Sequence, residues 1–292
     1  MNFRMIRHII GWLLLFECVF LAVPALTAVV YRERVVVYYL GAMALCGLLG
    51  WLCIRRKPPV TALYAREGFV IVAMSWILLS LMGALPLWLS REIPSFVDAL
   101  FETVSGFTTT GASILPEVER LSHAALIWRS FTHWVGGMGV LVFIMAFVPL
   151  SGGRNMHIMK AESPGPSVSK LVPRVRTTAM ILYALYMALT VIEFIFLLCG
   201  RMSVFDALNT AFSTAGTGGF GVRNDGMAGY SNYLQTVVTV FMLLFSINFG
   251  CYYLLLLRRI REAFNAEVRV FLLIVAAAVA VITVDLRLNG VI

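Results

Sequence analysis

Long apolar runs alternate with short polar segments along the whole chain. The apolar runs cover about 9–30, 35–54, 68–89, 126–150, 177–199, 234–257 and 268–284. As a helix, about 20 apolar residues cross a hydrocarbon core of about 30 Å. The pattern therefore predicts membrane-spanning helices at these positions, with the polar segments at the two membrane surfaces.

One of the polar segments, 95–113, has a composition of its own, SFVDALFETVSGFTTTGAS. Ser95 and Asp98 form a capping-box-like pair that predicts a helix start, and the run to Phe107 gives roughly 20 Å of helix. Such a helix crosses only part of a bilayer, and the small residues after it can expose successive backbone carbonyls. This indicates a re-entrant pore loop. The alternative is an interfacial helix followed by a threonine-rich external turn.

A second copy of this segment favours the pore loop. Residues 203–221 read SVFDALNTAFSTAGTGGFG and follow another apolar run. Aligned without a gap, the identical pairs include Ser95/Ser203, Asp98/Asp206, Ala99/Ala207, Leu100/Leu208, Ser105/Ser213 and Gly111/Gly219. A repeated capped helix with a glycine loop, twice between spans, predicts two equivalent structural units.

Composition and charge place the chain in a bilayer. Of 292 residues, 60% are hydrophobic and 13% charged, and the mean hydropathy is +0.89, which excludes a soluble domain. Most Lys and Arg residues fall on alternate loops, so the positive-inside bias accounts for the net charge of +8 without nucleic acid. It also predicts a cytoplasmic N-terminus and puts both glycine segments on the outer side.

Few residues suggest chemistry beyond ion passage. Glu17, Glu193 and His133 lie within apolar runs and could carry protons. For Glu17 and His133 the favoured alternative is an interior side chain hydrogen-bonded to a neighbouring helix. The histidines are scattered and the cysteines lack metal-ligand spacing, so we expect neither an enzyme nor a transition-metal site.

Three motifs together resemble one family. They are Phe107–Ser113 (FTTTGAS), Trp128–Gly139 (WRSFTHWVGGMG) and Ser213–Gly221 (STAGTGGFG). The chain is similar, over nearly its whole length, to the TrkH branch of the Trk/Ktr/HKT potassium transporters. The resemblance implies an all-α, potassium-channel-like fold of span–pore loop–span repeats around one pore, preceded by an extra helix pair. The glycines of the second motif are expected to pack tightly against the pore loop.

The resemblance also assigns residues to a selectivity filter. The first filter strand would be Thr109, Thr110, Gly111, Ala112 and Ser113, and the second would be Thr217, Gly218, Gly219 and Phe220. Gly216 is a rival for the second filter glycine, because Thr-Ala-Gly also resembles Thr-Thr-Gly. The ungapped alignment of the two segments favours Gly219.

On this basis the chain divides into five parts. They are a helix pair (1–57), a first repeat (58–150), a cytoplasmic connector (151–176), a second repeat (177–261) and the start of a third (262–292). The family pattern has four repeats, so we expect a truncated product, or two chains that pair to complete a pore.

The function expected from the resemblance is K⁺ uptake across the bacterial inner membrane, with K⁺ held by filter carbonyls and no cofactor. The implied partners are a cytosolic nucleotide-binding regulatory subunit of the TrkA type, a second copy in a homodimer and the lipid bilayer. The alternative is a non-conducting membrane subunit that binds partners and does not transport.

Overall fold

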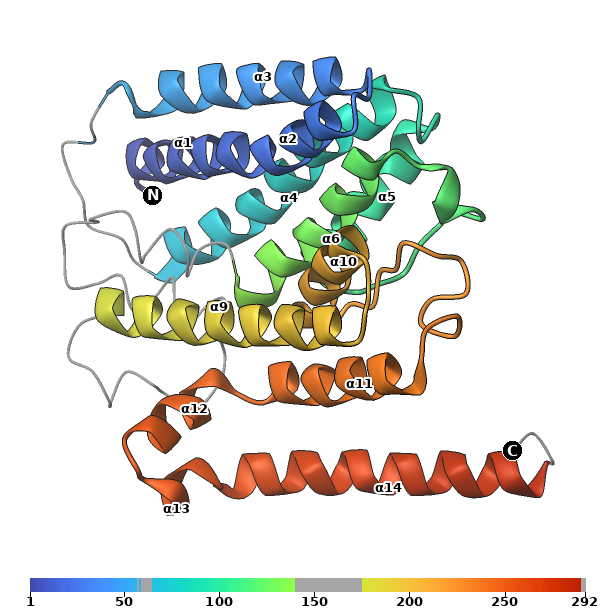
Figure 1. Cartoon of the computed structure of the whole chain (residues 1–292). Coiled ribbons are helices and arrows are strands. Elements are labelled where there is room, and N and C mark those ends of the chain that lie inside the picture. Colours follow the sequence, from blue (N-terminus) through green and yellow to red (C-terminus); the bar gives the residue numbers. More distant parts are fainter. Residues whose placement is uncertain (57, 59–64, 140–174, 290–292) are drawn as a thin grey trace. The chain divides into compact units, whose positions relative to one another are not determined.

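The computed structural model describes residues 1–56, 58, 65–139 and 175–289, and Figure 1 shows their helices in order. Within these residues the structure is helical and contains no strand. The predicted all-α fold class is confirmed. The chain forms two compact units, Met1–Phe245 and Ser246–Ile292.

The first unit begins with an N-terminal helix group. Helices α1 (Phe3–Phe20) and α2 (Ala22–Val30) form one long apolar run, and α3 (Val36–Ile54) packs back against α1. Gly11 and Gly50 let the two backbones approach closely, since a Cβ on Gly50 would lie 2.9 Å from the Gly11 carbonyl oxygen. The predicted leading pair of spans is present.

The next three helices are α4 (Ala65–Leu89), α5 (Phe96–Phe107) and α6 (His123–Met138), with the short helix η1 (Val118–Arg120) before α6. The half-length helix α5 packs against both α4 and α6. The predicted fourth span continues to 150, and its residues 140–150 lie outside the described part of the chain. So does the predicted connector, apart from 175–176.

The same order of helices recurs with α9 (Val175–Cys199), α10 (Val204–Ala215) and α11 (Asn232–Ser246). The half-length helix α10 packs against α6 as well as against α9. Helix α6 therefore contacts both half-length helices, as Figure 1 also shows. This places α6 where it can organise the segments that follow α5 and α10.

The N-terminal group is tied to the start of α6 by Glu33, which lies in the turn before α3. Its carboxylate accepts the backbone N–H groups of His123 at 2.8 Å and Ala124 at 3.1 Å. A carboxylate is favourable there because a helix N-terminus carries unpaired N–H groups and partial positive charge. Tyr31 stacks on the His123 ring beside it, with the ring centroids 3.8 Å apart.

The second unit contains α12 (Phe249–Leu256), α13 (Ile260–Ala263) and α14 (Ala266–Leu288). The predicted span over 234–257 is interrupted, because α11 ends at Ser246 and α12 begins at Phe249. Asn248 explains the break: its side chain accepts the backbone N–H of Gly250 at 2.9 Å and caps α12. Hydrophobic periodicity alone does not reveal such an internal cap.

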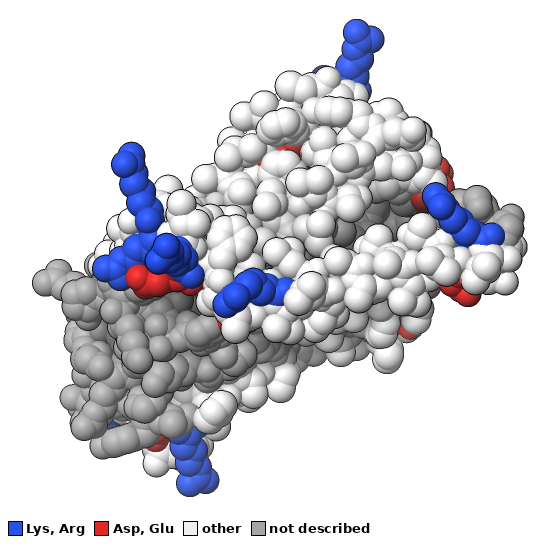
Figure 2. Space-filling view, turned by 90° about the horizontal axis from the view of Figure 1, so that it is seen from below, with Lys and Arg blue, Asp and Glu red and all other residues white. Residues whose placement is uncertain are grey.

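Several described helices are long and apolar enough to cross a bilayer. They are the α1–α2 run and α3, α4, α9 and α14. Large aliphatic and aromatic side chains are exposed on them, and Figure 2 shows one face where uncharged residues occupy most of the surface between scattered Lys and Arg. Exposed apolar surface of this extent suits lipid. The protein is a multi-pass membrane protein.

Candidate functional site

The two half-length helices begin in the same way. The Ser95 hydroxyl accepts the Asp98 backbone N–H at 3.4 Å, and the Ser203 hydroxyl accepts the Asp206 N–H at 3.0 Å. Each serine satisfies a helix N-terminal donor that would otherwise be unpaired. Both predicted caps are confirmed, and they put the two helices in matching register.

The helices also end in the same way. We call residues 108–113 the first glycine loop and residues 216–221 the second. The Thr110 N–H returns to the Ser105 carbonyl at 2.9 Å, and the Gly218 N–H returns to the Ser213 carbonyl at 3.1 Å. These pairs are equivalent in the ungapped alignment, so one local fold is built twice.

Backbone dihedrals identify the equivalent glycines. The φ angle is +75° at Gly111 and +82° at Gly219, in the left-handed region that side chains other than glycine rarely adopt. Gly216 instead follows α10 with φ −80°, like Thr108 after α5 with φ −81°. Gly219, not Gly216, therefore has the backbone geometry of Gly111.

The two glycine loops meet. A Cβ atom built on Gly111 would overlap the Gly218 carbonyl oxygen, so backbone lies against backbone at this point. The side chains of Thr110, Ala112 and Thr217 beside the contact are exposed, whereas the Phe220 ring is buried. The structure thus brings residues 109–113 and 217–219 together, and it turns the Phe220 side chain into the protein interior.

Close packing of α6 makes this contact possible. A Cβ on Gly136 would overlap the Phe107 carbonyl oxygen, and one on Gly137 would lie 2.8 Å from the Gly216 Cα. The expected tight packing of this glycine cluster is confirmed, and it involves the ends of both half-length helices, α5 and α10. Small residues allow such approach between membrane helices.

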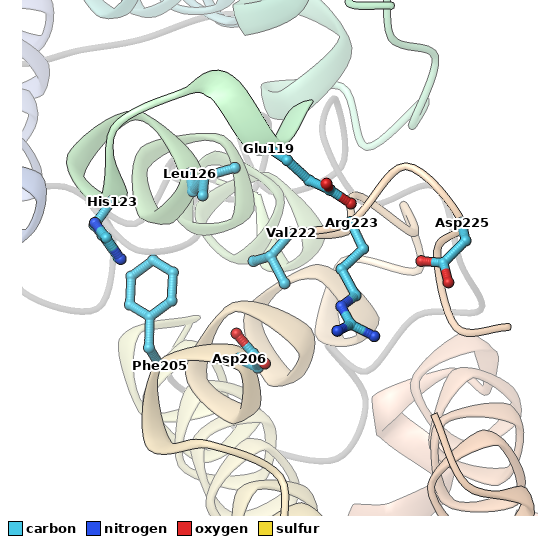
Figure 3. Close-up of a pocket in the computed structure, with 8 residues that line it drawn as sticks. All are labelled: Glu119, His123, Leu126, Phe205, Asp206, Val222, Arg223 and Asp225. Atoms are coloured by element: carbon cyan, nitrogen blue, oxygen red, sulfur yellow. The ribbon is translucent and has the colours of Figure 1, made fainter. Parts of the chain in front are cut away.

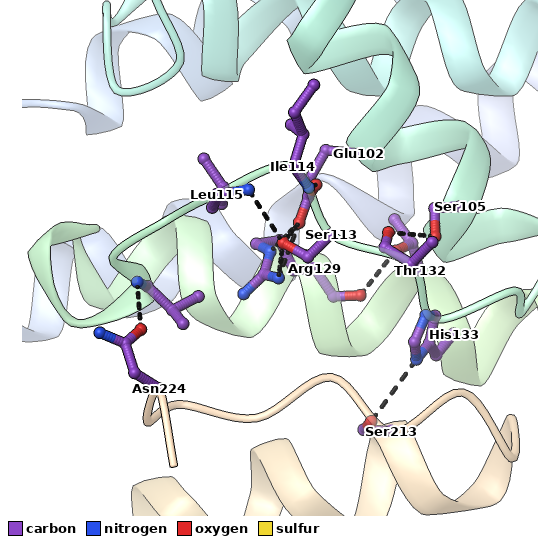
Figure 4. A network of polar contacts seen from close by, with 12 residues as sticks. Glu102, Ser105, Ser113, Ile114, Leu115, Arg129, Thr132, His133, Ser213 and Asn224 are labelled. Atoms are coloured by element: carbon purple, nitrogen blue, oxygen red, sulfur yellow. Dashed lines mark hydrogen bonds and ion pairs between the residues drawn. The ribbon is translucent and has the colours of Figure 1, made fainter. Parts of the chain in front are cut away.

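A buried ion pair lies behind the first glycine loop (Figure 4). Arg129 on α6 donates from Nε to a Glu102 carboxylate oxygen at 2.8 Å, and Nη2 lies 2.7 Å from the same oxygen. Glu102 also accepts the Ser113 hydroxyl at 2.8 Å and the Ile114 backbone N–H at 3.1 Å. The end of the loop is thus held to both α5 and α6.

His133, one turn beyond Arg129 on α6, contacts the second glycine loop. Its Nδ1 lies 3.5 Å from the Ser213 hydroxyl, and its ring stacks on Phe220 with centroids 4.1 Å apart. A Cβ on Gly218 would overlap the imidazole. The expectation of a buried histidine bonded to a neighbouring helix is confirmed, since Ser213 belongs to α10.

The two buried carboxyl groups flagged by the sequence lie behind the half-length helices. Glu17 is fully buried beside Gly83 of α4, and Glu193 is fully buried near Thr214 of α10. The expected hydrogen bond from Glu17 to a neighbouring helix is wrong: neither of its carboxylate oxygens has a hydrogen-bond partner among the described residues.

The chain segments after the loops are also linked. Asn224 accepts the Val118 backbone N–H at 2.8 Å and donates its own N–H to Glu119 at 3.3 Å. A pocket of about 450 Å³ lies beside this link, and Figure 3 shows its walls from both segments. It is lined by Glu119, His123, Leu126, Phe205, Asp206, Val222, Arg223 and Asp225.

Tyr230 borders the same region and donates its hydroxyl to Asp206 at 3.0 Å. Burial, reinforced by the neighbouring Asp206 carboxylate, raises the pKa of the Tyr230 phenol to about 12. Among the described residues there is no group of three or more His, Cys, Asp or Glu side chains that could hold a metal ion.

Sequence reasoning missed the Glu102–Arg129 pair and the role of the Phe220 ring. Glu102 is buried in α5, and a buried carboxylate needs a partner. The next basic residue inside an apolar run is Arg129, so this rule could have proposed the pair. The stacking of Phe220 between residues of α6 had no comparable signal.

Residues 32–290 match the family model described as TrkH, cation transport protein. The Trk system potassium uptake protein TrkH of Salmonella typhimurium is 35% identical, and the alignment covers 100% of this chain and 62% of that protein. The Trk system potassium uptake protein TrkG of Escherichia coli is 32% identical over 96% of this chain and 59% of its own length.

The fold is similar as well. The crystal structure of the potassium transporter TrkH from Vibrio parahaemolyticus superposes with a TM-score of 0.74 and 31% identity, covering 87% of this chain and 52% of that one. The chain therefore spans about 60% of the length of the curated relatives above. By sequence and by fold, the chain belongs to the TrkH family of cation transport proteins.

Proposed function

We propose that this chain forms part of a pathway for K⁺ across the bacterial inner membrane, with the two glycine loops as its selective wall. The observation that carries the proposal is the contact between Gly111 and the Gly218 carbonyl, at the ends of two capped half-length helices. Irregular backbone at membrane depth is tolerated where it lines a cavity or is buried in protein. Two such loops in contact fit a shared cation route.

Selection would come from backbone carbonyls. These carbonyls would replace part of the water shell of K⁺. In the first loop they belong to Thr109, Thr110, Gly111 and Ala112, and in the second to Thr217, Gly218, Gly219 and Phe220. No Asp or Glu occurs in 108–113 or 216–221, so the loops offer dipoles and no fixed charge. The C-terminal ends of α5 and α10 precede the loops and add partial negative charge, of order 0.5 charge each.

The remaining parts of the proposal concern the assembly. We place the N-terminus in the cytoplasm and keep the division into 1–57, 58–150, 151–176, 177–261 and 262–292. Further segments of the same protein or a second copy would supply the rest of the pore wall. Relatives named as Trk system proteins support a multi-component system, and we propose a TrkA-type cytosolic regulatory subunit and a homodimer.

The test is cation uptake by bacteria that lack their own K⁺ uptake systems and express this chain. Gly111→Ser and Gly219→Ser should each lower the ratio of Rb⁺ to Na⁺ uptake, because a side chain at positive φ displaces the carbonyls beside it. Gly41→Ser is the matched control, since a Cβ on Gly41 of α3 has no neighbour within 4 Å.

Two results would count against the proposal. An unchanged ratio in both loop variants, with normal protein levels, would refute the filter assignment. No Rb⁺ uptake by the unmodified chain above that of cells without it would instead support the alternative of a non-conducting subunit.

A further inference from the structure

Arg129 and His133 occupy successive turns of α6 and both are buried, with relative exposures of 3% and 0%. Residues four apart on a helix present their side chains on the same face. Here that face contacts the first glycine loop (108–113), which precedes α6 in the sequence, and the second glycine loop (216–221), which follows α10. Helix α6 is thus placed to relate one loop to the other.

Towards the first loop, Arg129 acts through a hydrogen-bonded chain. Its guanidinium reaches Glu102 from Nε and reaches the Ser113 hydroxyl from Nη2 at 3.2 Å. Because Glu102 also holds Ser113 and the Ile114 N–H, the exit of the loop is fixed at several atoms. The donors of a planar guanidinium are held at fixed angles, whereas those of an ammonium group rotate freely.

Towards the second loop, Arg129 acts through an aromatic ring. Its Cζ lies 4.3 Å from the centroid of the Phe220 ring, within the range of a cation–π interaction. His133 stacks on the same ring. Nη1 of Arg129 is buried and has no hydrogen-bond partner among the described residues, so the ring face is the partner that this side of the guanidinium contacts.

We propose that Arg129, supported by Glu102 and seated on Phe220, is a positioning residue that fixes the spacing of the two glycine loops and thereby sets cation selectivity. The inference rests on the proposed function, because spacing matters only if the loops coordinate an ion together. It assigns to a buried ion pair a role in discrimination between cations as well as in folding. Coordination by carbonyls depends on the number and placement of the dipoles, and a shifted loop alters both.

Two variants test the inference in different ways. Arg129→Lys keeps a positive charge beside Glu102 but loses the fixed N–H donors of the guanidinium and the planar surface that contacts the Phe220 ring. Phe220→Leu keeps apolar bulk and removes the ring. The matched controls are Arg120→Lys, in an exposed ion pair with Glu117, and Phe212→Leu, whose ring packs on Phe131 and Trp134.

The readouts are the ratio of Rb⁺ to Na⁺ uptake and the melting temperature of the purified chain in lipid nanodiscs. We expect the ratio to fall about fivefold in each of Arg129→Lys and Phe220→Leu, which corresponds to about 1 kcal/mol and lies within the range of a cation–π contact. The controls should keep the ratio of the unmodified chain. Arg129→Lys should melt close to the unmodified chain, because the charge of Glu102 remains compensated.

The outcomes separate this inference from the proposed function. If Gly111→Ser lowers the ratio while Arg129→Lys and Phe220→Leu fold and keep it, the positioning role is wrong and the filter stands. If both variants lower the uptake of Rb⁺ and Na⁺ equally and melt early, the pair is structural only and the inference is overturned. If Gly111→Ser leaves the ratio unchanged, the filter assignment fails first.

Discussion

Replacing Gly111 and Gly219 separately with alanine should cost different amounts of stability, although the two residues share a backbone conformation. The left-handed conformation costs an L-residue roughly 1–2 kcal/mol, and both glycines adopt it, with φ +75° and +82°. At Gly219 the added Cβ meets only the Met242 Cε, at 3.7 Å, which is ordinary contact. Gly219→Ala should therefore cost about 1–2 kcal/mol.

At Gly111 the same methyl group also overlaps the Gly218 carbonyl oxygen. Backbone on both sides has to move, and forcing extra volume into a packed site typically costs about 1–3 kcal/mol more. Gly111→Ala should thus destabilise the fold by about 2–5 kcal/mol in total. The difference in destabilisation between Gly111→Ala and Gly219→Ala measures the contribution of the contact between the two glycine loops.

The assay is denaturant unfolding of the purified chain in mild detergent at constant K⁺ concentration, followed by tryptophan fluorescence. Gly41→Ala controls for the change of residue type, because it adds a methyl group to an exposed helical position with open space. It should be neutral or stabilise by about 0.5–1 kcal/mol. Equal destabilisation by Gly111→Ala and Gly219→Ala would show that the loops do not touch in solution.

Three further changes test the surroundings of the site. Glu33→Gln removes the carboxylate that holds the start of α6 and should destabilise the first unit by about 1 kcal/mol, as measured by chemical unfolding; no change would argue against the tie. Asn224→Ala cuts the link between the segments after the two loops and should speed hydrogen exchange of the Val118 amide, whereas unchanged exchange would contradict the bond. Asp206→Asn should lower the pKa of Tyr230 from about 12, as measured by phenolate absorbance against a Tyr230→Phe reference. Because the folded-state pKa is raised, the contribution of Tyr230 to stability is complete below about pH 10 and is lost as pH rises through about 12.

Local signals in the sequence predicted the local structure well. Ser95 and Ser203 cap their helices as expected, because a cap is decided by side-chain and backbone atoms only a few residues apart. The ungapped alignment also identified Gly219 as the counterpart of Gly111, which the matching φ angles now show. The internal repeat made this prediction possible because identical residues adopt the same backbone conformation in both copies.

Features that depend on tertiary packing were missed. The Glu102–Arg129 pair joins residues on different helices, and sequence alone gives no distance between them. The break at Asn248 was missed because the apolar pattern continues across it, while a single side chain caps the new helix. Glu17 was expected to be hydrogen-bonded, because burial of a carboxyl group usually brings a partner; both its oxygens lack one among the described residues.

The most direct test of the central claim is a search for the ion itself. Crystals of the chain grown with Rb⁺ would be measured at the rubidium absorption edge, and the same crystals exchanged into Na⁺ would serve as the control. We predict anomalous density beside the contact between Gly111 and Gly218, lost on exchange. Ordered glycine loops in contact, with no Rb⁺ density beside them, would contradict the account.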